Sequence, residues 1–261
     1  MRFSAPSKET GYRALRIVIF YIAVIGVWWA IARAEIWSPY LFPAPDAVFK
    51  ALRTNLENGQ IPAAVLASLQ RMAIGYVVSF VLGMLLGILI ASSKWANETV
   101  GGVVLGVQSL PSITWLPLAV LWFGLSEQAI IFVVLMGSTF SIAISARAGI
   151  LGIPPLLQRA AGTLGASRWQ AYLYVVLPGM IPAMVQGMKQ GWSFAWRSLM
   201  AGELLFVSAG LGHLLDVGRN LNNIAMVFSV MFVIVIVGVA VDRLIFGRAE
   251  RWVQERWGYA A

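Results

Sequence analysis

Long apolar stretches constrain this chain more than any other feature of its sequence. A helix needs roughly 20 mainly apolar residues to cross a hydrocarbon core about 30 Å thick. Six stretches reach that length, and they cover residues 15–32, 73–92, 101–123, 128–146, 174–203 and 224–246. In addition, 59% of the residues are hydrophobic and 11% are charged, whereas soluble domains average about 25% charged residues. The sequence therefore predicts an all-α membrane protein with about six transmembrane helices.

The segments around these stretches indicate one transmembrane domain over residues 1–261, with its core at 66–246. No tandem repeat, low-complexity tract or second soluble domain is visible. Because no small-residue cleavage site follows the first stretch, we expect a retained helix and not a signal peptide. A short surface helix is expected after Pro43, Pro45 and Asp46, which form a helix-start signal. Its partial apolar stripe consists of Ala47, Phe49, Leu52 and Leu56.

The distribution of basic residues predicts the orientation, because cytoplasmic segments of membrane proteins collect Lys and Arg. With the N-terminus in the cytoplasm, the cytoplasmic segments contain Arg2, Lys8, Arg13, Arg16, Lys94, Arg147, Arg159, Arg168, Arg243, Arg248, Arg251 and Arg256. The opposite side contains the smaller set Arg33, Lys50, Arg53, Arg71 and Arg219. Both termini are therefore expected in the cytoplasm. We interpret the net charge of +8 as this topology signal, so membrane lipid and not nucleic acid is the expected partner.

The segment 147–172, which this orientation places in the cytoplasm, differs from an ordinary loop. Gly152 and the prolines after it end the preceding helix, and Gly165 is expected to end a short helix over PLLQRAAGTLGAS. The apolar side chains of this helix that are available to pack are Leu156, Leu157, Ala160, Ala161 and Leu164. Ser167 is the expected N-cap of a second short helix. Two interpretations stay open: a compact knob that contacts a partner, and an interfacial loop whose aromatic side chains lie among lipid headgroups.

The spacing within this segment resembles the EAA loop of ABC importer permeases. Ala160 and Ala161 are followed after three residues by Gly165, and after nine more by Val175, one further residue, Leu177 and Pro178. Arg159 stands where the family pattern has Glu, and Val175 replaces Ile. The resemblance implies a coupling loop at 152–172 that docks on an ATP-binding subunit. The residues assigned to this coupling contact are Arg159, Ala160, Ala161, Leu164, Gly165, Leu177 and Pro178.

Three further strings narrow the resemblance. PSITWLPLAVLWFGLS at 111–126, GWSFAWRSLMAGELL at 191–205 and SAGLGHLL at 208–215 resemble the nitrate, sulfonate, taurine and bicarbonate branch of type I importer permeases. The resemblance implies the type I ABC importer permease fold, also called MetI-like. It also implies partner chains: a cytoplasmic ATPase that holds ATP and Mg, an extracytoplasmic substrate-binding protein, and a second permease copy in a homodimer. Since no GxxxxGK[ST] phosphate loop occurs, this chain is not expected to bind ATP or another cofactor itself.

Polar residues interrupt the fifth stretch, although isolated charges near the bilayer centre cost at least about 2.5–3.5 kcal/mol each. One helical face carries Gln186, Lys189, Gln190, Ser193 and Arg197. One interpretation is a water-filled pathway in which Lys189 and Arg197 attract a small anion. The other is structural pairing, with Glu203 or a carbonyl of a neighbouring helix as the partner of Arg197. Glu203 itself is expected to be a gate or a structural partner, because its charge would repel an anion.

The third stretch adds polar side chains around Pro111, namely Gln108, Ser109, Ser112 and Thr114. A proline inside a span frees a backbone carbonyl, which is tolerated where the helix lines a cavity or packs against protein. These side chains therefore either line the pathway or satisfy the kinked backbone. We assign Gln108 and Ser112 to the pathway.

These observations lead to one main functional prediction. The chain is a permease subunit of an ATP-driven importer for a small anion such as nitrate, a sulfonate, taurine or bicarbonate. Two alternatives stay open: a permease for an amino acid or a phosphonate, and a secondary transporter or channel that works alone. An enzyme is not expected, since HExxH and GxSxG motifs are absent and Asp216 and Asp242 lie apart in the topology. No metal site is expected either, because His213 is the only histidine and cysteine is absent.

Overall fold

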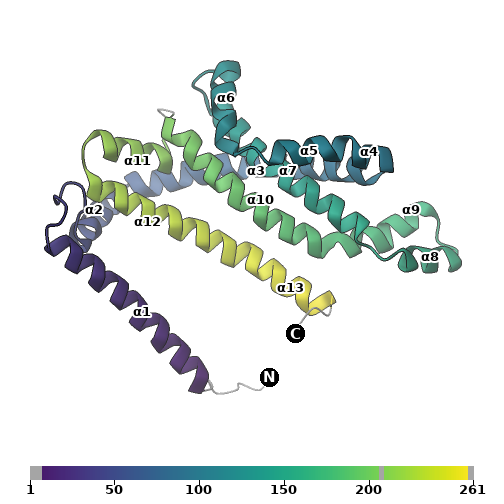
Figure 1. The fold of residues 1–261 in the computed structure, drawn as a ribbon, viewed down its shortest axis with the longest axis horizontal. Helices are drawn as coiled ribbons and strands as arrows, with labels where there is room; N and C mark the ends of the chain where they lie inside the picture. The colour runs from purple at the N-terminus through teal and green to yellow at the C-terminus, as the bar shows by residue number, and fades with distance from the viewer. Residues whose placement is uncertain (1–7, 206–208, 258–261) are drawn as a thin grey trace. The chain divides into compact units, whose positions relative to one another are not determined.

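The computed structural model describes residues 8–205 and 209–257 (Figure 1), which form helices and turns. Arg2 from the orientation argument and Ser208 from the third string lie outside the described residues. The chain divides into two compact units. The first contains residues up to Ile61 together with Leu215–Phe232, and the second contains Pro62–Leu214 and the residues from Val233 onward. The organisation of the chain as a single transmembrane domain stays a prediction.

The first unit contains α1 (Lys8–Arg33) and α2 (Pro45–Glu57). The apolar part of α1, Leu15–Arg33, is long enough to span a membrane, and none of its residues is buried. Trp28 ties α1 to the segment that follows it. Its Nε1 donates a hydrogen bond to the carbonyl oxygen of Pro43 at 3.1 Å, and its ring stacks on Phe228.

Helix α2 begins at Pro45, as the helix-start signal predicted. Its predicted apolar stripe is wrong, because Val48 and Asn55 are the buried residues while Phe49 and Leu56 are exposed. Successive residues of a helix lie about 100° apart around its axis. The buried face is therefore rotated by about one residue from the face that hydrophobicity alone indicated.

The second unit contains most of the long helices of the chain. Its helices are α3 (Gln60–Ala91, which begins in the first unit), α4 (Lys94–Glu98), α5 (Val100–Gln108), α6 (Leu116–Phe123), α7 (Glu127–Leu151), α8 (Pro155–Thr163), α9 (Arg168–Ala171), α10 (Leu177–Leu205) and α13 (Gly247–Trp257). Helices α11 (Leu211–Asn220) and α12 (Ile224–Val241) each belong partly to both units. A 3₁₀ turn covers Ser112–Trp115, and π-helical segments cover Tyr172–Val176 and Asp242–Phe246.

Helices α7 and α10 form the most extensive contact of this unit and run side by side in Figure 1. Small residues allow this approach, as is usual between membrane helices. A Cβ added at Gly187 would overlap the side chain of Ser145, and one added at Gly137 would overlap that of Ser198. Helix α3 approaches α7 in the same way, since a Cβ at Gly83 would lie 2.7 Å from the carbonyl oxygen of Thr139. Helices α3, α7 and α10 therefore form a tightly packed core.

Within residues 8–205 and 209–257, five helical segments are long and apolar enough to cross a membrane, and the total is six if the bent pair Lys94–Gln108 and Ser112–Phe123 counts as one span. The predicted span 101–123 is therefore wrong as a continuous helix, since its two parts meet at an angle of 95°. Pro111 explains the break: it has no N–H to donate, and its φ and ψ of −56° and 131° are not helical.

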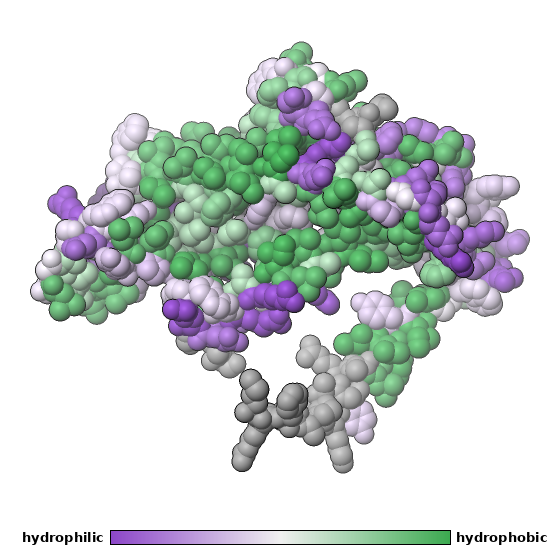
Figure 2. Space-filling model, turned by 180° about the vertical axis from the view of Figure 1, so that it is seen from behind, coloured by the Kyte–Doolittle hydropathy of each residue, from purple (hydrophilic) through white to green (hydrophobic). Residues whose placement is uncertain are grey.

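The other predicted spans correspond to real helices with different ends. The second begins at Gln60, the fifth begins at Arg168, and the sixth continues to Trp257. Figure 2 shows hydrophobic side chains over much of the visible face, with hydrophilic side chains gathered in separate groups. Many large apolar residues of α3 and α12 are exposed, among them Ile74, Val77 and Ile236. Such surfaces are expected where lipid and not water surrounds the helices.

Candidate functional site

The segment with the EAA-like spacing has the local structure that its capping residues predicted. Helix α8 ends in a Schellman motif, in which the Ala166 N–H donates to the Ala161 carbonyl at 3.0 Å and the Gly165 N–H to the Gly162 carbonyl at 3.0 Å. Gly165 has a φ of +83°, which favours glycine. Ser167 then caps α9 through a reciprocal capping box with Gln170. The first short helix, its end at Gly165 and the N-cap at Ser167 are confirmed, but the second helix is not short, because it continues without a loop from Arg168 to Leu205.

This segment, which we call the coupling segment (residues 152–172), exposes apolar side chains. Leu156, Leu164 and Trp169 are 73%, 88% and 68% exposed. Arg159 and Ala160 are exposed as well, while Ala161 is half-buried. Leu177 and Pro178 begin α10 immediately after the π-helical segment. The coupling role of these residues stays a prediction.

A cavity of about 440 Å³ brings together residues that lie far apart in the chain. Its lining residues are Gln108, Ser109, Leu110, Pro111, Ser112, Ile113, Met136, Gly137, Phe140, Ser141, Phe194, Arg197 and Ala201. They come from the end of α5 and the broken segment after it, from α7 and from α10. Three of the predicted pathway residues, Gln108, Ser112 and Arg197, are therefore neighbours around one space, which we call the Arg197 cavity.

Among the described residues that line this cavity, Arg197 is the one with a charged side chain. Its Nε donates to the Ser193 carbonyl one turn earlier at 3.0 Å, and its guanidinium lies 5.0 Å from the centre of the Phe194 ring. It makes no ion pair with the residues that the structure describes. The positive charge is consequently available to a solute in the cavity.

The hydroxyl groups near Pro111 divide between two roles. Ser109 Oγ donates to the Gly106 carbonyl at 2.6 Å, and Thr114 Oγ1 donates to the Pro111 carbonyl at 2.7 Å, so both satisfy the broken backbone. Ser112 Oγ instead accepts a hydrogen bond from Ser198 at 2.7 Å. Gln108 Nε2 donates to Ser141 at 3.2 Å, while the buried Gln108 Oε1 has no partner within the described part of the chain.

Lys189 lies in a different place from Arg197. Its Nζ is 2.9 Å from Glu250 Oε2 and 4.0 Å from Asp242 Oδ2, while Gln186 Nε2 donates to Glu250 Oε1 at 2.9 Å. We call these four residues the Lys189 cluster. The polar stripe of α10 is thus divided, because Gln186 and Lys189 bind Glu250 within the Lys189 cluster, whereas Arg197 lines the Arg197 cavity. Gln190 is exposed, and Ser193 Oγ donates to the Lys189 carbonyl at 3.2 Å.

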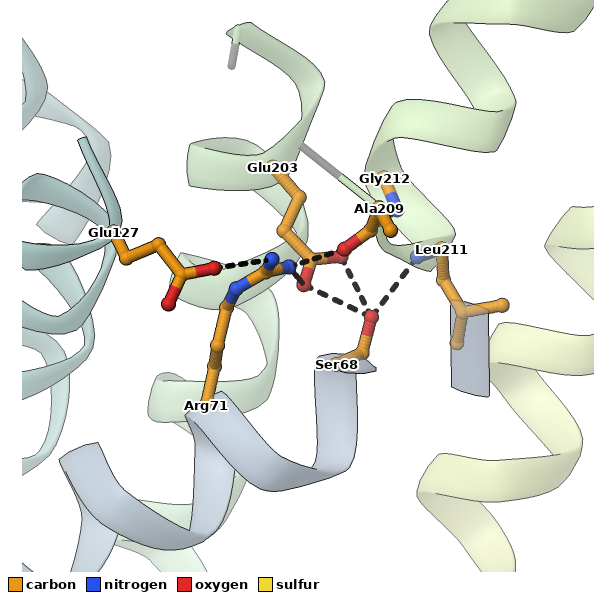
Figure 3. Close-up of polar contacts among 7 residues, drawn as sticks. All are labelled: Ser68, Arg71, Glu127, Glu203, Ala209, Leu211 and Gly212. Atoms are coloured by element: carbon orange, nitrogen blue, oxygen red, sulfur yellow. Dashed lines mark hydrogen bonds and ion pairs between the residues drawn. The ribbon is translucent and has the colours of Figure 1, made fainter. Parts of the chain in front are cut away.

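A third polar group surrounds Arg71, on α3 (Figure 3). Its Nη1 donates to Glu203 at 3.0 Å and to the Ala209 carbonyl at 2.5 Å, and its Nη2 donates to Glu127 at 2.9 Å. Ser68 Oγ lies 2.9 and 2.7 Å from the two carboxylate oxygens of Glu203. The Gly212 N–H donates to Glu203 at 3.0 Å, and the Leu211 N–H donates to Ser68 at 2.9 Å. We call this group the Arg71 cluster.

Sequence reasoning missed most of the Arg71 cluster. Arg71 was counted only as an outer basic residue, because the predicted second span began at residue 73, whereas α3 begins at Gln60. If the second span had been predicted to begin earlier, Arg71 would have been recognised as a lone charge within an apolar helix. Glu203, which we suggested as a partner of Arg197, pairs with Arg71 instead. A gate role for Glu203 stays a prediction.

Residues 79–257 match the family described as the binding-protein-dependent transport system inner membrane component. The chain belongs to this family. It is therefore a membrane permease component of an ABC transport system. The branch suggested by the three strings is supported by named relatives. The taurine transport system permease protein TauC of Escherichia coli is 28% identical over 78% of this chain and 76% of its own. The nitrate import permease protein NrtB of Synechocystis is 28% identical over 69% of this chain and 66% of its own.

Solved permeases confirm the fold. A chain of the MetNI methionine ABC transporter, in an inward-facing conformation, aligns with a TM-score of 0.64, 23% identity and coverage of 73% of this chain and 94% of that chain. A chain of an amino acid ABC transporter aligns with a TM-score of 0.62, 18% identity and coverage of 78% and 97%. The predicted type I importer permease fold is thus confirmed, and at these identities the alignments bear on the fold alone.

Proposed function

We propose that this permease moves a small solute with one anionic group, such as nitrate, a sulfonate, taurine or bicarbonate, into the cytoplasm. The observation that carries the proposal is Arg197, a cation that forms no ion pair with the described residues and lies in a cavity with no carboxylate among its described lining residues. A guanidinium binds planar or tetrahedral oxyanions through paired N–H groups. Gln108 and Ser112 supply further polar groups, and the named functions of the relatives agree with this class of solute.

The proposed partners follow from the family and from the coupling segment. A separate ATPase chain with its ATP and Mg would dock on residues 152–172, where exposed apolar side chains surround the Gly165 turn. An extracytoplasmic binding protein would deliver the solute on the opposite side. Because each chain has one coupling segment, two permease copies would engage two ATPase subunits symmetrically. In this arrangement both termini lie in the cytoplasm, and membrane lipid covers the apolar surface.

An uptake assay tests the solute class. The gene would be deleted in its native cells and restored as the parent or as Arg197→Gln, Arg197→Lys or Arg53→Gln. Uptake of labelled nitrate, taurine, an alkylsulfonate and bicarbonate would be measured, with methionine for the amino-acid alternative. Removal of a charged hydrogen bond to the solute is expected to lower uptake by about tenfold or more for Arg197→Gln. Arg197→Lys should retain part of the activity and Arg53→Gln nearly all; equal uptake by all variants would refute the proposal.

A pull-down tests the coupling contact independently. The tagged permease would be isolated in mild detergent as the parent, as Gly165→Asp and as Gly59→Asp. Gly59 is a matched control, because it also ends a helix with positive φ, at +78°, and nothing lies within 4 Å of its added Cβ. A P-loop ATPase should accompany the parent and the Gly59 variant but not the Gly165 variant. Recovery of the ATPase with all three would reject residue 165 as part of the contact.

A further inference from the structure

The Lys189 cluster joins two helical segments that share an unusual feature. Tyr172–Val176 is π-helical immediately before α10, and Asp242–Phe246 is π-helical immediately before α13. Segments of π-helix interrupt the regular hydrogen-bond pattern and frequently accompany functional sites. The ion pair between Lys189 of α10 and Glu250 of α13 connects the two helices beyond these interruptions.

The coupling segment leads directly into one of these helices. Residues from Arg168 to Leu205 form one continuous helical segment of 38 residues, so α9, the π-helical turn and α10 follow each other without a loop. Displacement of the coupling segment must therefore act on α10. The coupling segment has no comparable direct connection to α13, because α13 follows α12 near the C-terminal end of the chain.

Contacts between α10 and α13 are few and specific. Glu250 uses both carboxylate oxygens, because Oε1 accepts from Gln186 and Oε2 accepts from Lys189, one turn apart on α10. Beside these bonds lies a cavity of about 290 Å³ lined by residues of both helices, including Pro182, Val253 and Gln254. The apolar packing leaves a gap at this place, and the polar bonds of Glu250 join the two helices beside it.

We propose that the Lys189–Glu250 ion pair is a transmission link that makes α13 move together with α10 when the coupling segment is displaced. This inference rests on the proposed function of a coupled permease. Lys189 is then a positioning residue and not a lining residue of the solute pathway. Phe246 supplies a fixed point for α13, because it is buried and its ring lies 6.0 Å from that of Trp192 on α10. The ion pair, one turn further along, controls the remainder of the helix.

The transmission link and a pathway role for Lys189 predict different results. A pathway role requires a positive charge at residue 189. A link through the ion pair requires opposite charges at residues 189 and 250, whichever of the two carries the positive charge. The informative variants are therefore Lys189→Met, Glu250→Gln, the double variant Lys189→Met/Glu250→Gln, and the charge exchange Lys189→Glu/Glu250→Lys. Glu255→Gln is the matched control, because Glu255 is an exposed carboxylate on the same helix.

The first experiment compares solute uptake with ATP hydrolysis in proteoliposomes that contain the complete complex. For the single variants, we expect ATP hydrolysis within about twofold of the parent and uptake reduced by about tenfold, within the range of energetic coupling between sites. The charge exchange restores an ion pair and should recover most of the lost uptake, whereas the double neutral variant has no ion pair and should stay impaired. If the charge exchange stays as inactive as Lys189→Met, a positive charge at residue 189 itself is required and the link is rejected. Equal loss of uptake, hydrolysis and assembled complex in the single variants would also reject it, since that result indicates a folding role only.

The second experiment does not depend on the solute. Because the chain has no cysteine, spin labels can be placed uniquely at Gln190→Cys on α10 and Gln254→Cys on α13, both exposed. Their separation would be measured in the complex without nucleotide and after trapping with ATP and vanadate. The link predicts the same distance distribution in both states, and a broader or shifted distribution after Lys189→Met. A separation that changes equally in parent and variant would overturn the inference, even if no tested anion were transported.

Discussion

The Arg71 cluster and the Lys189 cluster place similar chemistry in different surroundings. In each, one cation on a long apolar helix faces two carboxylates. The Arg71 and Glu203 side chains are 8% and 0% exposed, whereas Lys189 and Glu250 are 33% and 19% exposed. Opening a buried ion pair leaves a charge without water or partner, while a partly exposed pair can exchange its partner for water. The first cluster is therefore suited to hold helices in place, and the second to connect helices that move.

Hydrogen bonding strengthens this contrast. Glu203 accepts from Arg71, from the Ser68 hydroxyl and from the Gly212 backbone N–H, so its buried carboxylate is well supplied with donors. The same bonds hold residues 209–212 against α3 and α10. Within the described part of the chain, the donors to the Glu250 carboxylate are the side chains of Gln186 and Lys189. A network with backbone donors keeps its geometry as long as the fold persists, whereas side-chain donors can rotate away.

The largest effect is expected from Arg71→Met. This variant leaves Glu203 buried without its cation, and removal of one partner of a buried ion pair typically costs about 3–5 kcal/mol. The free energy of unfolding would be measured by denaturant titration in mixed micelles. The double variant Arg71→Met/Glu203→Met should recover much of the loss, because no buried charge remains. A loss below about 1 kcal/mol for Arg71→Met would show that water reaches Glu203 and that the contrast with Lys189 is false.

A smaller loss is expected from Gly212→Ala. An added Cβ at this position would lie 2.6 Å from Cβ of Glu203 and 2.7 Å from the Met200 carbonyl oxygen. The shifts that relieve such an overlap typically lower the free energy of unfolding by about 1–3 kcal/mol. They would also lengthen the hydrogen bond from the Gly212 N–H to the Glu203 carboxylate. Gly102→Ala is the control, because Gly102 lies in α5 with nothing within 4 Å of an added Cβ. Gly102→Ala should leave the free energy of unfolding unchanged or raise it. If Gly212→Ala and Gly102→Ala had equal effects in the same titration, close packing around Glu203 would be excluded.

Whether the sequence could predict these features depends on how far apart in the chain the interacting residues lie. Gly165 and Ser167 act within one turn of their own helices, so the structure of the coupling segment could be predicted from neighbouring residues alone. The ion pair of Arg71 with Glu203 joins residues 132 positions apart. Such a partner depends on which helix faces meet, and that is decided by the packing of α3, α7 and α10 together.

The polar stripe of α10 shows the same limit within one helix. Helical periodicity correctly placed polar residues along α10, and Arg197 does line a cavity with Gln108 and Ser112. It could not show that Glu250 approaches the first part of the stripe and pairs with Lys189. Pro111 was a visible signal for a distorted span, but the 95° angle at the break depends on the packing of the two parts.

Lys189→Met is expected to affect stability less than either change near Glu203. Water can hydrate the carboxylates that lose their cation, so the loss should be about 1 kcal/mol or less. Salt sharpens the comparison, because ionic strength screens partly exposed charges more than buried ones. The stability difference between parent and Lys189→Met should shrink at high salt, while the difference for Arg71→Met should persist. The same denaturant titrations at low and high salt check this, and equal salt dependence would remove the distinction between the clusters.

The smallest effect is expected within the Arg71 cluster itself. Glu127 also accepts from Arg71, at 2.9 Å, but its side chain is 63% exposed. Glu127→Gln removes a charge that water already solvates, and Arg71 keeps its bonds to Glu203 and to the Ala209 carbonyl. The expected loss is about 0–1 kcal/mol, measured beside Arg71→Met in the same titration. A loss as large as that of Arg71→Met would mean that Glu127 and Glu203 hold Arg71 as one unit. In that case it is the network, and not the burial of each carboxylate, that determines how firmly α3 is joined to α7 and α10.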